Sequence, residues 1–113
     1  MKIGFNLLLW TGHVTQENFP LFKKLKAVGY DGVEIPIFDT SDPSHFKKIG
    51  DALKDHGLEA TAVTVLPDEA HNAISASAKN RKGAIEHLKR VIECGHNAGI
   101  QTLCGPYYPV SYT

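Results

Sequence analysis

The sequence has no net charge and no long apolar run, and both absences narrow the possible functions. Its 113 residues include 12 basic and 12 acidic side chains, whereas a broad nucleic-acid surface needs clustered Lys and Arg that acids do not neutralise. No apolar run approaches the ~20 residues of a membrane span, and the first residues enter a strand without the apolar core of a signal peptide. We therefore expect a soluble, cytoplasmic protein with no nucleic-acid partner and no membrane partner.

The common motifs of metal binding and nucleophilic catalysis are also missing. No HxH, HExxH or CxxC spacing occurs among the six histidines and two cysteines. There is no Gly-rich phosphate loop, and no Ser or Cys lies in a nucleophile-elbow setting. Cys94 and Cys104 fall in separate predicted elements, a helix and a strand, so we expect reduced thiols. The sequence thus predicts neither a catalytic residue nor a metal ligand in this chain.

One local pattern is repeated three times along the chain. A basic amphipathic segment runs into a glycine, at Gly29, Gly57 and Gly99, and a strand-like apolar run follows. The expected strands are 2–9, 32–37, 58–65 and 100–105. This order predicts the α/β class, a parallel βαβαβαβ arrangement with right-handed crossovers.

The expected helices begin with recognisable capping residues and carry one apolar stripe each. Their caps are Thr15 or Asn18, Asp42 before Pro43, and Ser77. The stripes are Leu21, Phe22, Leu25 and Val28; Phe46, Ile49 and Leu53; and Ile85, Leu88, Val91 and Ile92. We expect each stripe to face the sheet.

The alternation within the first two strands favours a barrel over an open sheet. One side of each strand is bulky and aliphatic, and the other side includes Asn6 and Glu34. An open doubly wound sheet has helices on both faces and needs both to be apolar, whereas a barrel has helices only outside. A (β/α)8 barrel takes about 250 residues, so residues 1–113 are expected to form a single partial domain, the first half of a TIM barrel. Either the chain is an N-terminal fragment, or it is a half-barrel that covers its open edges by pairing.

In a barrel, the functional face lies at the carboxyl ends of the strands. Glu34 has two interpretations. In the functional one, it faces the lumen and orients a substrate or a metal-site residue. In the structural one, an Arg or Lys in the lumen pairs with the carboxylate, or the carboxyl group is in its neutral form. Trp10 and Tyr108, with Tyr107, are expected at the rim, where an aromatic face can stack on a sugar ring or simply pack. His13 and His71 fall in loops of this face, and the other four histidines fall on helices away from it.

Three stretches together resemble a known group: residues 2–6 (KIGFN), 29–35 (GYDGVEI) and 103–106 (LCGP). They resemble the sugar phosphate isomerase/epimerase superfamily of xylose isomerase-like TIM barrels, most of all the D-tagatose/D-psicose 3-epimerase family. The similarity covers the whole chain as the first half of that family. It implies an enzyme that acts on a small-molecule sugar, a ketose epimerase or isomerase, and moves a proton at a carbon next to a carbonyl.

The resemblance also implies where the chemistry is located. The family holds a divalent metal, Mn, Mg or Co, with Glu, Asp, His and Glu on strands five to eight. Those strands are outside this chain, so we expect the chain alone to bind no metal and to be inactive. The resemblance assigns substrate contacts by position to Asn6, Val63, Thr64, Gly105 and Pro106, which complete the predicted substrate-binding set with Trp10, Glu34 and Tyr108. Asn6 departs from the usual aromatic residue.

Other functions stay open at this point. Inosose dehydratase-like and hydroxypyruvate isomerase-like enzymes share the fold, and a non-catalytic half-barrel could assemble with a partner. A DNA-repair endonuclease of this superfamily is disfavoured, because it would need histidine ligands on early strands and a basic face. A homo-oligomer is expected, because assembly would hide the strand edges.

Overall fold

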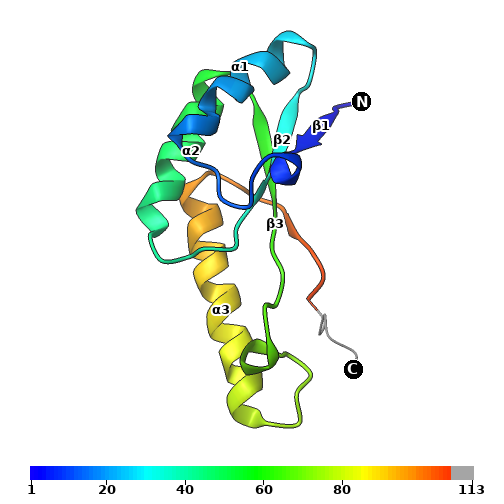
Figure 1. Cartoon of the computed structure of the whole chain (residues 1–113), viewed down its shortest axis with the longest axis vertical. Coiled ribbons are helices and arrows are strands. Elements are labelled where there is room, and N and C mark those ends of the chain that lie inside the picture. The colour runs from blue at the N-terminus through cyan, green and yellow to red at the C-terminus, as the bar shows by residue number, and fades with distance from the viewer. Residues whose placement is uncertain (108–113) are drawn as a thin grey trace.

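The computed structural model describes residues 1–107, in which four parallel strands alternate with three α-helices (Figure 1). The strands are β1 (Gly4–Asn6), β2 (Gly32–Pro36), β3 (Glu59–Val63) and β4 (Leu103–Cys104). The helices are α1 (Phe19–Ala27), α2 (Pro43–Asp55) and α3 (Ala78–Asn97), with 3-10 turns η1 (Leu7–Leu9), η2 (Gln16–Asn18) and η3 (Glu69–His71). The predicted βαβαβαβ order and α/β class are confirmed.

The strands lie side by side in chain order, β1-β2-β3-β4. Gly4 pairs with Gly32, Glu34 with Thr61, and Val63 with Cys104. The helices cover one face of this sheet (Figure 1), as in a barrel wall. β1 and β4 are the outer strands, so each has one edge without a strand partner among the described residues.

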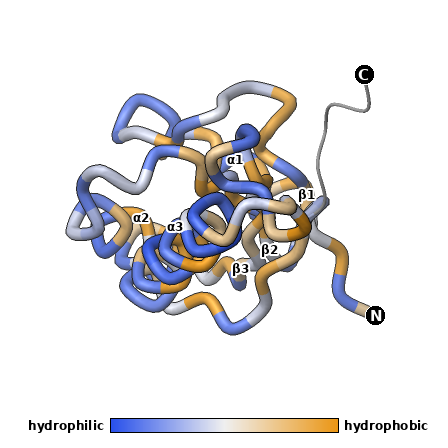
Figure 2. Tube along the Cα trace, turned by 90° about the horizontal axis from the view of Figure 1, so that it is seen from below, coloured by the Kyte–Doolittle hydropathy of each residue, from blue (hydrophilic) through white to orange (hydrophobic). Residues whose placement is uncertain are grey.

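The hydrophobic core lies between the helices and the outer face of the sheet. Phe22 from α1, Phe46 from α2 and Ile35 from β2 are at most 1% exposed. Viewed along the long axis, hydrophilic segments lie mostly on the outer turns of α2 and α3, and hydrophobic ones lie toward the strands (Figure 2). Of the helices that the structure describes, none combines the length and apolar character needed to cross a membrane.

α2 forms as the sequence predicts. The Asp42 carboxylate accepts the backbone N–H of Ser44 at 3.1 Å, and Pro43 occupies the first turn. Phe46, Ile49 and Leu53 are all buried. Gly50 allows α3 to approach closely, because a Cβ at this position would lie 2.7 Å from the Ala98 carbonyl oxygen.

The first strand is shorter than predicted. The strand ends at Asn6, although three leucines follow, because the Asn6 Oδ1 accepts the backbone N–H of Leu8 at 2.8 Å and caps the turn η1. Leu7 is buried, but Leu9 is 70% exposed. A local side-chain bond has therefore replaced the continuation of the strand.

Two helix faces were also predicted wrongly. Val28 is 73% exposed because α1 ends at Ala27. Ile85 and Ile92 of α3 are 54% and 59% exposed, and the face toward the sheet is instead formed by a row that includes Ala84, His87, Val91 and Cys94. These smaller side chains permit closer packing, and the isoleucines fall on the flank of the helix.

Candidate functional site

Four polar side chains form a row across the inner face of the sheet, one from each strand. Asn6 pairs with Glu34 and Glu34 with Thr61 in the strand register, and Cys104 pairs with Val63 on β3. Alternate residues of a strand point to the same face, so residues 61 and 63 share a side. The row therefore lies opposite the helix-covered face.

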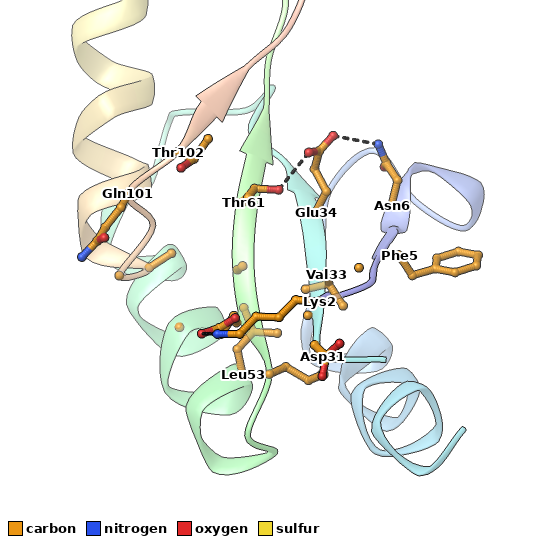
Figure 3. A pocket seen from close by; sticks show the side chains of 18 of the residues that line it. Lys2, Phe5, Asn6, Asp31, Val33, Glu34, Leu53, Thr61, Gln101 and Thr102 are labelled. Atoms are coloured by element: carbon orange, nitrogen blue, oxygen red, sulfur yellow. Dashed lines mark hydrogen bonds and ion pairs between the residues drawn. The ribbon is translucent and has the colours of Figure 1, made fainter. Parts of the chain in front are cut away.

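Glu34 is the centre of this row. Its Oε1 accepts a hydrogen bond from Asn6 Nδ2 at 3.1 Å, and its Oε2 accepts from Thr61 Oγ1 at 2.8 Å. The Cys104 Sγ lies 3.6 Å from the same Oε2 and 3.4 Å from the Ala62 carbonyl oxygen, so these two acceptors share its single hydrogen. Figure 3 shows Asn6 and Thr61 pointing toward the Glu34 carboxylate from the two neighbouring strands.

Neutral donors, not a cation, satisfy the Glu34 carboxylate. No Lys or Arg forms an ion pair with it among residues 1–107, so the interpretation that invoked a structural Arg or Lys is wrong for this part of the molecule. The Glu34 side chain is held in place by hydrogen bonds from Asn6 on β1 and Thr61 on β3 and by the nearby Cys104 thiol on β4. Burial, together with the nearby Glu34 charge, raises the pKa of the Cys104 thiol.

The described residues do not fit a divalent metal. Among residues 1–107, no group of three or more His, Cys, Asp or Glu side chains is placed to hold an ion. The Glu34 oxygens already accept hydrogen bonds from protein groups. The other side chains of the row are an amide, a hydroxyl and a thiol that lies 3.6 Å from the carboxylate. No metal-dependent step can be assigned to these side chains.

Four of the six histidines lie in two pairs, and neither pair forms a metal site among residues 1–107. His45 was predicted to lie away from the functional face, but its ring stacks on His13 at a centroid separation of 4.8 Å, and its Nε2 lies 2.7 Å from the Val14 carbonyl oxygen. His71 lies near His87, with ring centroids 5.5 Å apart. Both pairs are stabilised by ring packing and by hydrogen bonds to backbone carbonyl oxygens. In each pair a loop histidine contacts a helix histidine that is distant in the sequence, so the sequence did not predict the contact.

A groove of about 840 Å³ runs around the amino-terminal half of the sheet, where the strands meet the ends of α2 and α3. It is lined mainly by the amino-terminal and middle parts of the strands and by the ends of α2 and α3. Of the predicted substrate-binding residues within 1–107, Asn6 and Glu34 line it and the others do not. Functional groups of a barrel gather at the carboxyl ends of strands. The polar row lies where the groove meets that end, so we place the candidate site there.

The other predicted residues lie around this row. Val63 ends β3 on the inner side and is partly buried, as is Pro106 after β4. Thr64 is fully buried, and its hydroxyl donates to the Ile37 carbonyl oxygen at 2.6 Å. Gly105 has a φ of +141°, and a Cβ there would lie 1.9 Å from the Thr64 carbonyl oxygen. Glycine is thus required for β4 to approach β3.

The aromatic rim is only partly described. Trp10 is 45% exposed and stacks on Phe5 at a centroid distance of 4.8 Å, so one of its ring faces is already used. Phe5 alternates with Asn6 and points away from the row (Figure 3). The Tyr107 hydroxyl is buried and has no hydrogen-bond partner among the described residues. Tyr108 lies outside the described residues.

Two members of the row, Thr61 and Cys104, were missed by sequence reasoning. The side on which Thr61 lies could have been found by extending the alternation of strands one and two to the third strand, since residues 59, 61 and 63 share the side of Glu34. The position of Cys104 beside Val63 depends on the register of β4 on β3, which alternation does not give. The connection from β3 to α3 contains the turn η3. Its Glu69 carboxylate accepts from Asn72, Ser75 and Asn80, which orders the loop and lowers the pKa of that carboxyl.

Comparison with known proteins assigns this arrangement to a family. A family model described as xylose isomerase-like TIM barrel matches residues 22–112. A ketose 3-epimerase from Arthrobacter globiformis is 34% identical over 96% of this chain, and a probable ketose 3-epimerase from Synechocystis sp. is 30% identical over 99% of it. The chain spans only 37% and 39% of the lengths of these relatives.

Solved structures have the same fold over the same part. A D-psicose 3-epimerase crystallised in the presence of D-fructose superposes with a TM-score of 0.80 at 22% identity, covering 100% of this chain and 40% of that one. An L-ribulose 3-epimerase superposes with a TM-score of 0.75 at 21% identity, covering 93% and 35%. At these identities the likeness establishes the fold: four βα-linked parallel strands that correspond to the first half of a barrel.

Proposed function

Because the chain belongs to the xylose isomerase-like TIM barrel family, we propose that it is the N-terminal half of a ketose 3-epimerase and forms one wall of the sugar-binding lumen. The observation that carries the proposal is the polar row centred on Glu34, which places hydrogen-bonding groups on the inner face of the sheet. The names of the relatives at 30% and 34% identity support the same activity.

The proposed substrate wall has two parts. Asn6 and Glu34 supply polar contacts in the lumen, and residues at the strand ends, Val63, Gly105 and Pro106, shape the mouth above them. Thr64 supports this mouth from behind, through its bond to the Ile37 carbonyl oxygen. Trp10 and Tyr108 remain proposed rim residues.

The catalytic groups are proposed to lie on strands five to eight. Epimerisation next to a carbonyl needs one group to remove a proton from the carbon and another to return it on the opposite face. A divalent metal, when bound, would polarise the carbonyl and hydroxyl oxygens of the ketose. The residues described here bind and orient the sugar and exclude water on their side of the lumen.

The flank of α3 supports a continuing barrel. Ile85, Leu88 and Ile92 recur at helical spacing on one side of the helix, whereas α2 packs on the other side, where Asn97 Nδ2 donates to the Pro43 carbonyl oxygen at 2.9 Å. β4 is the outer strand of the sheet, and its second edge has no strand partner within residues 1–107. We propose that the next βα unit covers both, and that further assembly into a homo-oligomer occurs outside this half.

Solvent exchange tests the function directly. The full-length protein, incubated with ketohexoses and a divalent metal in D2O, should incorporate deuterium at C3 and yield the C3 epimer, both detected by NMR. Residues 1–113 alone, checked by circular dichroism for folding, should do neither. Absence of exchange by the full-length protein with every ketose tested would refute the proposal. Saturable ketose binding by residues 1–113 without metal would favour a self-sufficient binding module.

A further inference from the structure

The side-chain amide of Asn6 is anchored at both ends. Its Oδ1 accepts the Leu8 N–H at 2.8 Å, and its Nδ2 donates to Glu34 Oε1 at 3.1 Å. A flipped amide would place its NH2 group against the Leu8 N–H and its oxygen against a carboxylate, both of which are unfavourable. The two bonds therefore fix a single orientation of the amide.

This orientation leaves one donor for a ligand. An amide nitrogen has two hydrogens, and only one of those on Asn6 Nδ2 has an acceptor among residues 1–107. Asn6 is exposed and lines the groove. Its second N–H is thus available to an oxygen atom in the lumen.

Glu34 is fixed in turn from its other side. Thr61 Oγ1 donates to Oε2, the Cys104 Sγ lies 3.6 Å from the same oxygen, and Oε1 is directed toward Asn6. A carboxylate that is hydrogen-bonded from both neighbouring strands has little freedom to rotate, so its Oε1 stays oriented toward the Asn6 amide. Residues on β3 and β4 therefore orient Glu34 on β2, and Glu34 in turn orients Asn6 on β1.

We propose that Glu34 is a positioning residue, which orients Asn6 so that the second Nδ2 hydrogen donates to a hydroxyl or carbonyl oxygen of the bound substrate. This inference rests on the proposed function and deepens it, since it assigns direct substrate contact to Asn6 and an indirect role to Glu34. Replacement of the carboxylate by another acceptor of the same shape should then preserve the role.

A double-mutant cycle in the full-length protein tests this assignment with an active ketose. Asn6→Ala and Glu34→Met should each raise KM about tenfold with kcat within about twofold, because each removes the same ground-state contact. The double variant should also be about tenfold worse, not about a hundredfold, because coupled residues are non-additive. Glu34→Gln keeps an acceptor for Asn6 and should restore KM to within about threefold of wild type.

Two threonine variants provide a matched control. Thr61→Val removes a donor to Glu34 and should raise KM about threefold. Thr102→Val removes a hydroxyl from the same face of the sheet, outside the row and outside the proposed substrate-binding set, and should leave KM unchanged. Independent, multiplying effects in the double variant would overturn the proposal, as would a Glu34→Gln protein as impaired as Glu34→Met or a loss confined to kcat.

The side-chain amide resonances of Asn6 separate this inference from the proposed function. Glu34→Met should shift the two Nδ2 proton signals, and Glu34→Gln should return them toward their wild-type positions. Unchanged signals would overturn the positioning role whether or not the protein is an epimerase. If Glu34→Met shifts the signals but the wild-type protein turns over no ketose, the Glu34–Asn6 contact is supported and the substrate contact of Asn6 is overturned.

Discussion

Glu34 and Ile35 are neighbours in β2, yet they belong to two different environments. Ile35 is fully buried among side chains of the helix layer, whereas the Glu34 carboxylate lies on the inner face, with hydrogen bonds from Asn6, Thr61 and Cys104. The outer face contains the apolar core, and the inner face contains the polar row. Stability and recognition are thus divided between alternate residues of the same strands, and they should respond separately to substitution.

The largest loss of stability is expected on the outer side. Phe46→Ala removes a side chain that is 1% exposed in the core, which should lower the free energy of unfolding by about 3–5 kcal/mol. Phe38→Ala is the matched control, because Phe38 is 38% exposed and should cost less than about 1 kcal/mol. Urea unfolding of both variants measures the difference, and equal losses would contradict the placement of the core.

Gly105 joins the two regions, because it permits the approach of β4 that brings Cys104 to the row. Gly105→Ala meets both a positive φ and the Thr64 carbonyl oxygen, 1.9 Å from the new Cβ. Gly29→Ala meets a φ of +107° with nothing within 4 Å, so it reports backbone strain alone, about 1–2 kcal/mol. Thermal unfolding should show Gly105→Ala as clearly the more destabilised; a smaller loss than for Gly29→Ala would argue against the close approach.

The stability of the outer, helix-covered side should depend on pH through His87. Burial lowers the pKa of His87 below its usual 6.5, so at pH values just below 6.5 the unfolded chain binds more protons than the folded one. The stability due to neutral His87 should be complete above that pH and decline as the pH falls toward the folded pKa. Urea unfolding between pH 8 and 5 should show a shallower decline for His87→Gln, and no such change for His96→Gln on the exposed surface.

The smallest effect is expected on the exposed flank of α3. Ile85→Gln with Ile92→Gln should change the stability of residues 1–113 by less than about 0.5 kcal/mol, because both side chains are more than half exposed. In the full-length protein the same pair should cost about 1–3 kcal/mol if the next helix covers it. Equal small effects in both proteins would remove the proposed contact, and Lys89→Gln on the same helix serves as a control.

How far the sequence predicts this molecule depends on the range of the interactions involved. The cap at Asp42 and the buried stripe of α2 follow from neighbouring residues and were predicted correctly. Ile85 and Ile92 were assigned to the core because periodicity gives an apolar stripe without saying whether a sheet or a neighbouring helix covers it. Glu34 was predicted to lie on the polar side, but its partners depend on strand register: Thr61 is 27 residues away and Cys104 is 70. Local patterns do not encode such pairings, and Asn6 ends its strand through a side-chain bond that hydropathy does not reveal.

Adjacent substitutions in β2 of the full-length protein provide the most direct test of the division between the two faces. Glu34→Met should raise KM for the ketose about tenfold and leave the unfolding midpoint nearly unchanged. Ile35→Val should lower stability by about 1 kcal/mol and leave KM unchanged. The contrary result, in which KM and stability change together in both variants or Ile35→Val alters KM while Glu34→Met does not, would contradict the account.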